Sequence, residues 1–197
     1  MPPEWPGDIP PMTSRFLIAC AGSVVIAAPA FAVIERPSAL KTVLDGADAI
    51  FVATVERLDP ARPAAVFTVE RELKGTAGVA RLPVNLAGDK ADQAAKLLER
   101  LAPGLPVVLF VTATEAGKKR VALAYTDGTW FQVIGRQDGP DVRWAFTHCE
   151  PYLRRTFKGS TAELEAIVAG VLAGKRTPPK LDPREPPGLG PAVKRPG

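Results

Sequence analysis

The sequence predicts a mainly β domain with two helices, built as a small antiparallel barrel of the OB type. Short segments rich in Val, Ile, Phe and Thr recur along the chain, and turns of Gly, Pro and Asp separate them, as in a β-sheet protein. Helical periodicity is found in two places, after the third expected strand and at the end of the domain. Because helices do not alternate with strands, a parallel α/β sheet is disfavoured.

Three strands are expected before the first helix, and residues 38–45 lead into them as a short helix or loop. Turn residues at Asp59-Pro60 and at Gly75 separate the three strands. Pro83 lacks the N–H that an inner strand needs, so it places the third strand at an edge or a bulge. The expected strands span residues 49–57, 65–73 and 79–86.

Two amphipathic helices are predicted. The first covers residues 89–101, with Asp89 as its N-cap and its apolar residues on one face. The second begins after Ser160, which forms a capping box with Glu163. Its apolar stripe consists of Leu164, Ile167, Val168, Val171 and Leu172.

Four further strands are expected between the helices, so that the sheet has about six or seven strands in mainly antiparallel order. The segment 106–112 is continuously apolar, which is typical of a buried central strand. Asp127-Gly128 is a strong two-residue hairpin signal. The other three strands span residues 120–125, 129–134 and 142–147.

Residues 1–32 have the pattern of a secretory signal peptide, with translation starting at Met1 or at Met12. An apolar run from Phe16 to Ala28 ends near Ala30-Phe31-Ala32, whose small residues predict cleavage after Ala32. This run is shorter than the roughly 20 residues that span a bilayer. The expected product is therefore an exported protein, periplasmic or extracellular.

A lipid anchor is one alternative to cleavage, and an uncleaved N-terminal anchor is another. Leu17-Ile18-Ala19-Cys20 resembles a lipobox, which would make Cys20 a lipidated N-terminus. The apolar run before Cys20 is short for this purpose, and it continues beyond Cys20. The cleaved product, beginning at Val33, is therefore favoured.

After cleavage, residues 33–174 are expected to form a single OB-like domain and residues 175–197 a disordered tail. The tail is basic and rich in proline, so it has little apolar surface to bury. It is either a passive solvated segment, a tether to cell-surface anions, or the ligand of a Pro-recognising partner.

The first half of the domain resembles a known family. Ala47-Asp48-Ala49-Ile50-Phe51-Val52-Ala53-Thr54-Val55 and Val69-Glu70-Arg71-Glu72-Leu73-Lys74-Gly75 are similar to the first two strands of bacterial exported proteins with the netrin-like OB fold, and residues 107–111 to a later strand. This is the fold of the tissue inhibitors of metalloproteinases. The resemblance covers about residues 45–115 and implies an OB-like barrel. It does not imply protease inhibition, because those inhibitors need an N-terminal cysteine and disulfides that this chain lacks.

Catalytic residue types cluster in one place, His148-Cys149-Glu150. Adjacent residues of a strand point to opposite faces, so His148 is badly placed to activate Cys149 as a nucleophile. His148 and Glu150 would share a face, but one His, one Cys and one Glu make at most a weak, open zinc site. We therefore expect no catalytic residue, no metal site and no cofactor. Cys149 is expected to be buried; the alternatives are a free thiol or a Cys149-linked dimer.

Aromatic and basic residues late in the domain are the candidate ligand contacts. If Phe131 faces the core, Trp130 is exposed and can stack on a sugar or peptide; the favoured alternative is that most of the late aromatic residues fill the core. Arg154 and Arg155 either bind an anionic partner or form ion pairs with Glu150 and Glu163. The candidate ligand-binding residues are Trp130, Trp144, His148, Glu150, Tyr152, Arg154 and Arg155.

The sequence thus predicts an exported, non-enzymatic binding module whose partner is an extracytoplasmic protein or an anionic polymer. The net charge of +4 comes from scattered Lys and Arg, so nucleic acid is not expected as a partner. The first alternative is an envelope interaction or structural protein that docks through its Pro-rich tail. The second alternative is a hydrolase or metal-dependent enzyme.

Overall fold

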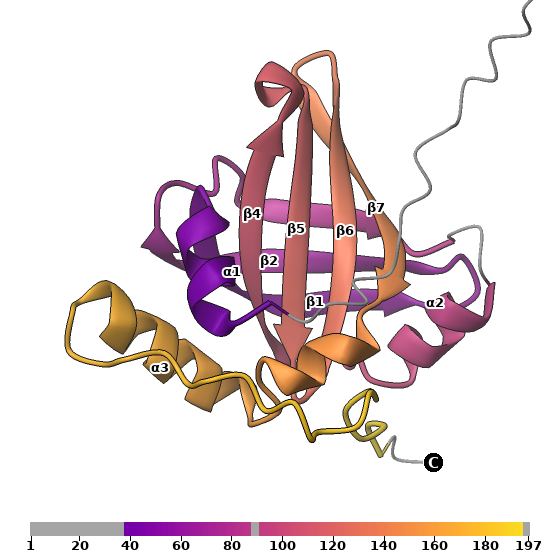
Figure 1. Ribbon diagram of the computed structural model, residues 1–197. Helices are drawn as coiled ribbons and strands as arrows, with labels where there is room; N and C mark the ends of the chain where they lie inside the picture. The colour runs from indigo at the N-terminus through magenta and orange to yellow at the C-terminus, as the bar shows by residue number, and fades with distance from the viewer. Residues whose placement is uncertain (1–37, 88–90, 195–197) are drawn as a thin grey trace, which may run out of the picture. The chain divides into compact units, whose positions relative to one another are not determined.

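Seven strands close into a barrel in the order β1-β2-β3-β7-β6-β5-β4 (Figure 1). The computed structural model describes residues 38–87 and 91–194; the expected signal peptide and the predicted N-cap Asp89 lie outside them. The barrel expected from the sequence is confirmed. The strands are β1 (Ala49–Asp59), β2 (Ala64–Lys74), β3 (Arg81–Asn85), β4 (Pro106–Thr114), β5 (Lys119–Thr126), β6 (Thr129–Asp138) and β7 (Asp141–Cys149).

Three α-helices accompany these strands in the described part of the chain, one more than the sequence predicts. They are α1 (Leu40–Gly46), α2 (Ala91–Leu98) and α3 (Thr161–Leu172), with 3₁₀ turns η1 (Glu115–Gly117) and η2 (Pro151–Arg155). A helix as short as α1 is not stable alone, and it forms because Leu40, Val43 and Leu44 are buried against the barrel. Ser160 is the N-cap of α3, as expected, since its Oγ accepts the Glu163 N–H at 3.2 Å.

The barrel closes between β3 and β7, where the strands run parallel. Two residue pairs, Val84 with Trp144 and Asn85 with Ala145, make this closure. The other strand neighbours in the barrel are antiparallel. Pro83 lies opposite Val66 of β2, just before the first of the two pairs. Because β3 has neighbours on both sides, it is not the edge or bulged strand that Pro83 predicts; the parallel pairing with β7 begins only after the proline.

Apolar side chains fill the interior of the barrel. They come from all seven strands and from the face of α2 that turns inward, so that α2 plugs one end. The cluster includes Phe51, Phe67, Leu82, Leu97, Leu101, Leu109, Phe131, Trp144 and Phe146. Since these side chains are almost wholly buried, the barrel is a packed core and not a container.

A second core lies outside the barrel. The outward side chains of β1, β4, β5 and β6 are covered by α1, η2 and α3, and Figure 1 shows α1 beside β4. Its members include Ile50, Val52, Val108, Phe110, Tyr125, Trp130, Leu153, Leu164 and Val168. These strands are therefore buried on both faces, which explains the continuously apolar sequence of β4.

The predicted hairpin turn at Asp127-Gly128 joins β5 to β6 and also anchors α3. Both residues have positive φ, 35° and 82°, as a type I′ turn requires. The Asp127 carboxylate accepts the backbone N–H and the hydroxyl of Thr161, each at 2.9 Å. In return, the Asp127 N–H donates to Thr161 Oγ1 at 2.9 Å. The turn thus fixes the start of α3 against the barrel.

The C-terminal segment differs from the disordered tail that its composition predicts. It has no helix or strand, but its backbone is hydrogen-bonded at several points to η2, to β6 and to the residue after α2. Within residues 185–193, here called the strap, Gly188 donates to Pro151 O at 3.0 Å and Val193 to Glu99 O at 2.8 Å. Gly190 donates to Thr129 Oγ1 at 3.0 Å. Polar anchoring thus replaces the apolar burial that the segment lacks.

Gly190 tests this anchoring, because a Cβ there would lie 2.1 Å from Asp127 O and 2.8 Å from Thr129 Oγ1. We expect Gly190→Ala to release the strap while the barrel remains folded. Hydrogen exchange should then accelerate at the Gly188 and Val193 amides and not in the strands. Gly46→Ala is the control, since its Cβ meets nothing within 4 Å. Unchanged exchange in the Gly190 variant would contradict the anchoring.

Candidate functional site

Trp130 is buried, and the prediction that it is exposed for stacking is wrong. The strand alternation is as expected, because Phe131 faces the inner core and Trp130 the outside. However, the outer face is covered at this point by η2 and α3. The Trp130 Nε1–H donates to Phe157 O at 2.9 Å, and its ring lies 4.7 Å from that of Tyr125. Trp130 is a part of the second core.

Trp144 is also buried, on the inner side of β7 at the closure of the barrel. Gly135 of β6 is its register partner, and a Cβ at Gly135 would lie 3.0 Å from the indole ring. The ring therefore fills the space that Gly135 leaves. Neither tryptophan presents a face to a ligand.

His148 and Glu150 lie together, as the sequence predicts, and both side chains are buried. His148 Nε2 is 2.7 Å from Glu150 Oε1. The register shift between β6 and β7 leaves Gln132 opposite His148 and Phe131 opposite Cys149. Because Cys149 points into the inner core, His148 points to the opposite side of the strand. The pair ties the end of β7 to the start of η2.

Cys149 is buried, and its environment suits a structural thiol. Burial raises the pKa of Cys149 to about 12, so the thiolate is scarce at neutral pH. The Cys149 N–H donates to Gln93 Oε1 at 3.3 Å, and the thiol lies 3.9 Å from Gln93 O. The geometry supports the buried alternative and makes Cys149 a poor nucleophile. An intermolecular disulfide would require this residue to leave the core.

Arg154 and Arg155 both contact Glu185, a residue that the sequence did not identify as their partner: Arg154 binds its carboxylate and Arg155 its backbone carbonyl. Arg154 donates from Nε and Nη2 to Glu185 Oε1 at 3.1 and 3.0 Å, and Lys158 pairs with the other oxygen. Arg155 Nε donates to Glu185 O at 2.8 Å, and its guanidinium lies 5.8 Å from the ring of Tyr152. Lys158 and Arg154 lower the pKa of Glu185 below its ordinary value.

This arrangement corrects the expected partners. The expected partners, Glu150 and Glu163, are nearer in the chain, whereas the observed partner Glu185 belongs to the strap. Local spacing gives no signal for a contact over such a separation. Arg154 and Arg155 hold the strap and do not form an open anion site.

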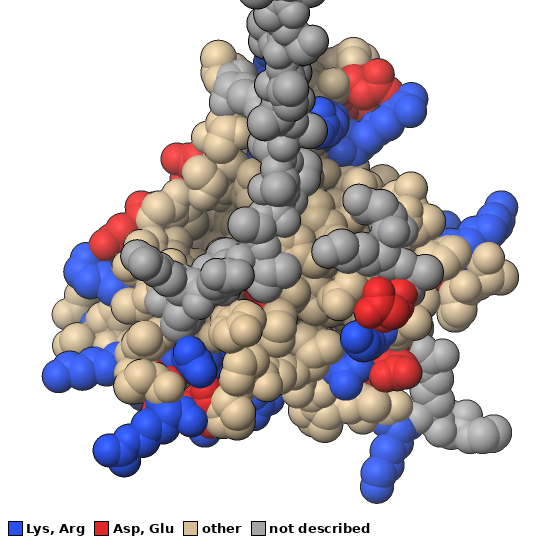
Figure 2. All heavy atoms as spheres, turned by 45° about the vertical axis from the view of Figure 1, so that its right-hand side comes forward, with Lys and Arg blue, Asp and Glu red and all other residues tan. Residues whose placement is uncertain are grey.

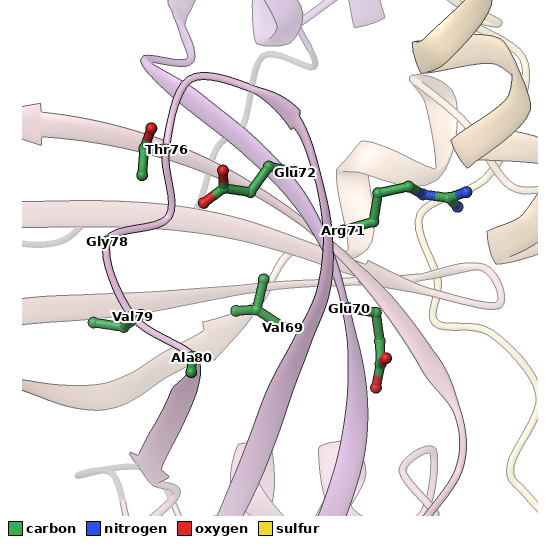
Figure 3. A pocket seen from close by; sticks show the side chains of 8 residues that line it. All are labelled: Val69, Glu70, Arg71, Glu72, Thr76, Gly78, Val79 and Ala80. Atoms are coloured by element: carbon green, nitrogen blue, oxygen red, sulfur yellow. The ribbon is translucent and has the colours of Figure 1, made fainter.

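A shallow recess of about 360 Å³ lies where β2 leads into the β2–β3 loop (Figure 3). Glu72 turns toward the loop, and its Oε1 accepts the Ala77 N–H at 2.7 Å. Arg71 points away and pairs with Glu165 of α3. Glu72 and Arg71 thus serve the fold rather than converging on a ligand. The lining residues are Val69, Glu70, Arg71, Glu72, Thr76, Gly78, Val79 and Ala80.

Within residues 38–87 and 91–194, no three His, Cys, Asp or Glu side chains are grouped so that they could hold a metal ion. None of the helices in that part of the chain is long and apolar enough to span a bilayer. No protein-family model matches the chain, and a comparison with curated proteins finds no match.

Titration of Cys149 should weaken the fold at high pH. The unfolded thiol ionises near its ordinary pKa of 9.0, whereas the folded thiol keeps its proton up to about 12. The contribution of the buried, protonated thiol to the free energy of unfolding is therefore fully present below pH 9 and is lost as the pH rises from 9 towards 12. Relative to Cys149→Ala, the wild-type protein should lose about 1.4 kcal/mol of unfolding free energy per pH unit in this window. If the unfolding free energies of the two proteins change in parallel between pH 9 and 12, the burial of the thiol is contradicted.

Loss of His148 should destabilise the protein through Glu150. His148→Ala removes a partner that lies 2.7 Å from the buried Glu150 carboxylate, and we expect a loss of roughly 3 kcal/mol in urea unfolding. Adding Glu150→Gln should recover part of this loss, because a neutral amide is cheaper to bury. Arg143→Ala on the exposed part of β7 is the control and should cost less than about 1 kcal/mol. Additive effects of the two substitutions would argue against the pair.

Proposed function

We propose that this protein is an exported, non-enzymatic binding module that engages its partner through the outer surface of the barrel. The filled interior carries this proposal, because the inner core and α2 leave no space for a ligand inside. The candidate side chains support it as well. Their contacts are internal and hold the fold; this is so for Trp130, Trp144, His148, Arg154 and Glu150.

The chemistry of the candidate residues supports a binding role over a hydrolytic one. A nucleophile needs a base within hydrogen-bond reach and access to substrate. Cys149 faces the core with a raised pKa, and His148 points to the other side of the strand toward Glu150. Neither residue is arranged to attack a bound substrate.

We assign the barrel to the OB-like, netrin-like class as part of this proposal. The resemblance in β1 and β2 supports it, as does the position of α2 between β3 and β4, where it plugs the barrel. An OB barrel has five strands, and this barrel has seven in the described chain. The β5–β6 hairpin, which carries the Asp127-Gly128 turn, accounts for the difference if it is an insertion between neighbouring strands.

Export is tested by the mass of the protein made in a bacterial host. We expect the mature wild-type chain to begin at Val33. Ala32→Asp should remain uncleaved, because the processing enzyme requires a small residue there. Cys20→Ser should leave the mature mass unchanged. A lipid-modified mass that Cys20→Ser abolishes would replace the cleaved form by a lipoprotein, and wild-type protein retained uncleaved in the cytoplasm would exclude export.

The binding role is tested by fractionation of the same cells. We expect the mature protein to sediment with the envelope at low ionic strength and to be released by about 0.5 M salt, at which exposed charges are screened. The control is an unrelated, folded exported protein of similar net charge. Complete recovery of the wild-type protein in the soluble exported fraction at low salt would count against a binding module of this kind.

A further inference from the structure

After α3 the chain turns back along the same helix toward η2 (Figure 1). We call residues 175–184 of this segment the basic arm. Its start is fixed because the Lys175 and Arg176 N–H groups donate to Gly170 O at 2.8 and 3.1 Å. Its end is fixed because the Asp182 N–H donates to Arg155 O at 2.9 Å. The arm therefore has a defined position on the domain.

Four cationic side chains project from the arm: Lys175, Arg176, Lys180 and Arg184. All four residues are exposed, and none of them has an ion pair within the described chain. The one carboxylate of the arm, Asp182, accepts the backbone N–H of Arg184 at 3.0 Å. The arm thus presents a surplus of positive charge to the solvent.

Most basic residues around the barrel are arranged differently. Ion pairs neutralise many of them, and Figure 2 shows acidic and basic side chains interspersed on one face, without a broad area of one charge. The pairs are Lys41–Asp45, Arg62–Asp59, Arg71–Glu165, Arg81–Glu56, Lys96–Asp92, Arg100–Glu99 and Arg143–Asp138. The arm differs in that all four of its cations are unpaired within the described chain and follow one another along one short segment.

The arm is also extended. Pro178, Pro179 and Pro183 exclude helix, and no helix or strand is present from Arg176 to Asp182. Arg176, Lys180 and Arg184 follow one another at intervals of four residues, or roughly 12 Å at the rise of an extended proline-rich chain. Because both ends are already fixed, little conformational entropy is lost when these cations engage a partner.

We infer that the basic arm binds a linear anionic polymer, one that carries phosphate, sulfate or carboxylate groups along its chain. This inference rests on the proposed binding function and names its site. A row of cations on a fixed, extended backbone matches charges repeated along a line. A lipid surface fits less well, because the large apolar side chain of the arm, Leu181, is half-buried and does not project for insertion.

Binding to fluorescein-labelled heparin and to long-chain polyphosphate tests the inference, measured by anisotropy on the folded mature protein. Replacing Lys175, Arg176, Lys180 and Arg184 by Ala should weaken binding by about tenfold or more at low salt. The matched control replaces four exposed cations of the barrel, Arg57, Arg62, Lys118 and Arg136, by Ala. This control has the same net charge and should change binding less than about twofold. A variant with Arg176→Lys and Arg184→Lys should keep most of the affinity, because it keeps the charge.

Three outcomes would overturn the inference: equal losses in the arm variant and the control, no loss in the arm variant, or tighter binding to phosphatidylglycerol vesicles than to either polymer. Preference for heparin or for polyphosphate would indicate which anion the arm accepts. The envelope fractionation separates the two proposals. If the arm variant sediments like the wild-type protein, the arm is wrong and the binding function stands. If the wild-type protein itself does not sediment, the binding function fails.

Discussion

The closure of the barrel between β3 and β7 is the constraint on which the other features depend. Two parallel residue pairs hold the seam, and parallel pairing is slightly weaker per residue than antiparallel pairing. The seam is stabilised mainly by what it encloses, because Val84 and Trp144 contribute to the inner core that α2 plugs. Removing apolar contacts from this core would therefore affect the topology as well as the packing.

A second core outside the barrel explains why no open binding site lies where the sequence suggests one. Covering β1, β4, β5 and β6 with helices buries the outward aromatic residues that a half-exposed sheet would present to a ligand. It also requires partners for their polar atoms, and Phe157 O and Gly159 O accept the Trp130 N–H and the Tyr125 hydroxyl. Every buried side-chain N or O atom in the described chain has such a partner. Aromatic and polar residues that look available in the sequence are thus used by the fold.

Features set by neighbours in the chain could be predicted. Alternation located the strands, Asp127-Gly128 the hairpin, and the Ser160–Glu163 spacing the start of α3, because each depends on a few adjacent residues. Features set by distant residues could not. Alternation correctly placed Trp130 outside the barrel, but the helix that covers it follows much later in the chain. The pairing of Arg154 with Glu185 likewise needs the path of the strap.

The same distinction explains the C-terminal segment. Composition correctly indicates that this segment has no apolar core of its own, but it says nothing about backbone anchors on another surface. Glu185 is surrounded by Arg154 and Lys158, and Gly190 fits where a Cβ would clash with the Asp127-Gly128 turn. These contacts fix the strap and occupy the carboxylate of Glu185. Because Glu185 pairs with Arg154 and Lys158, it does not neutralise the neighbouring basic arm, and the cations from Lys175 to Arg184 stay exposed.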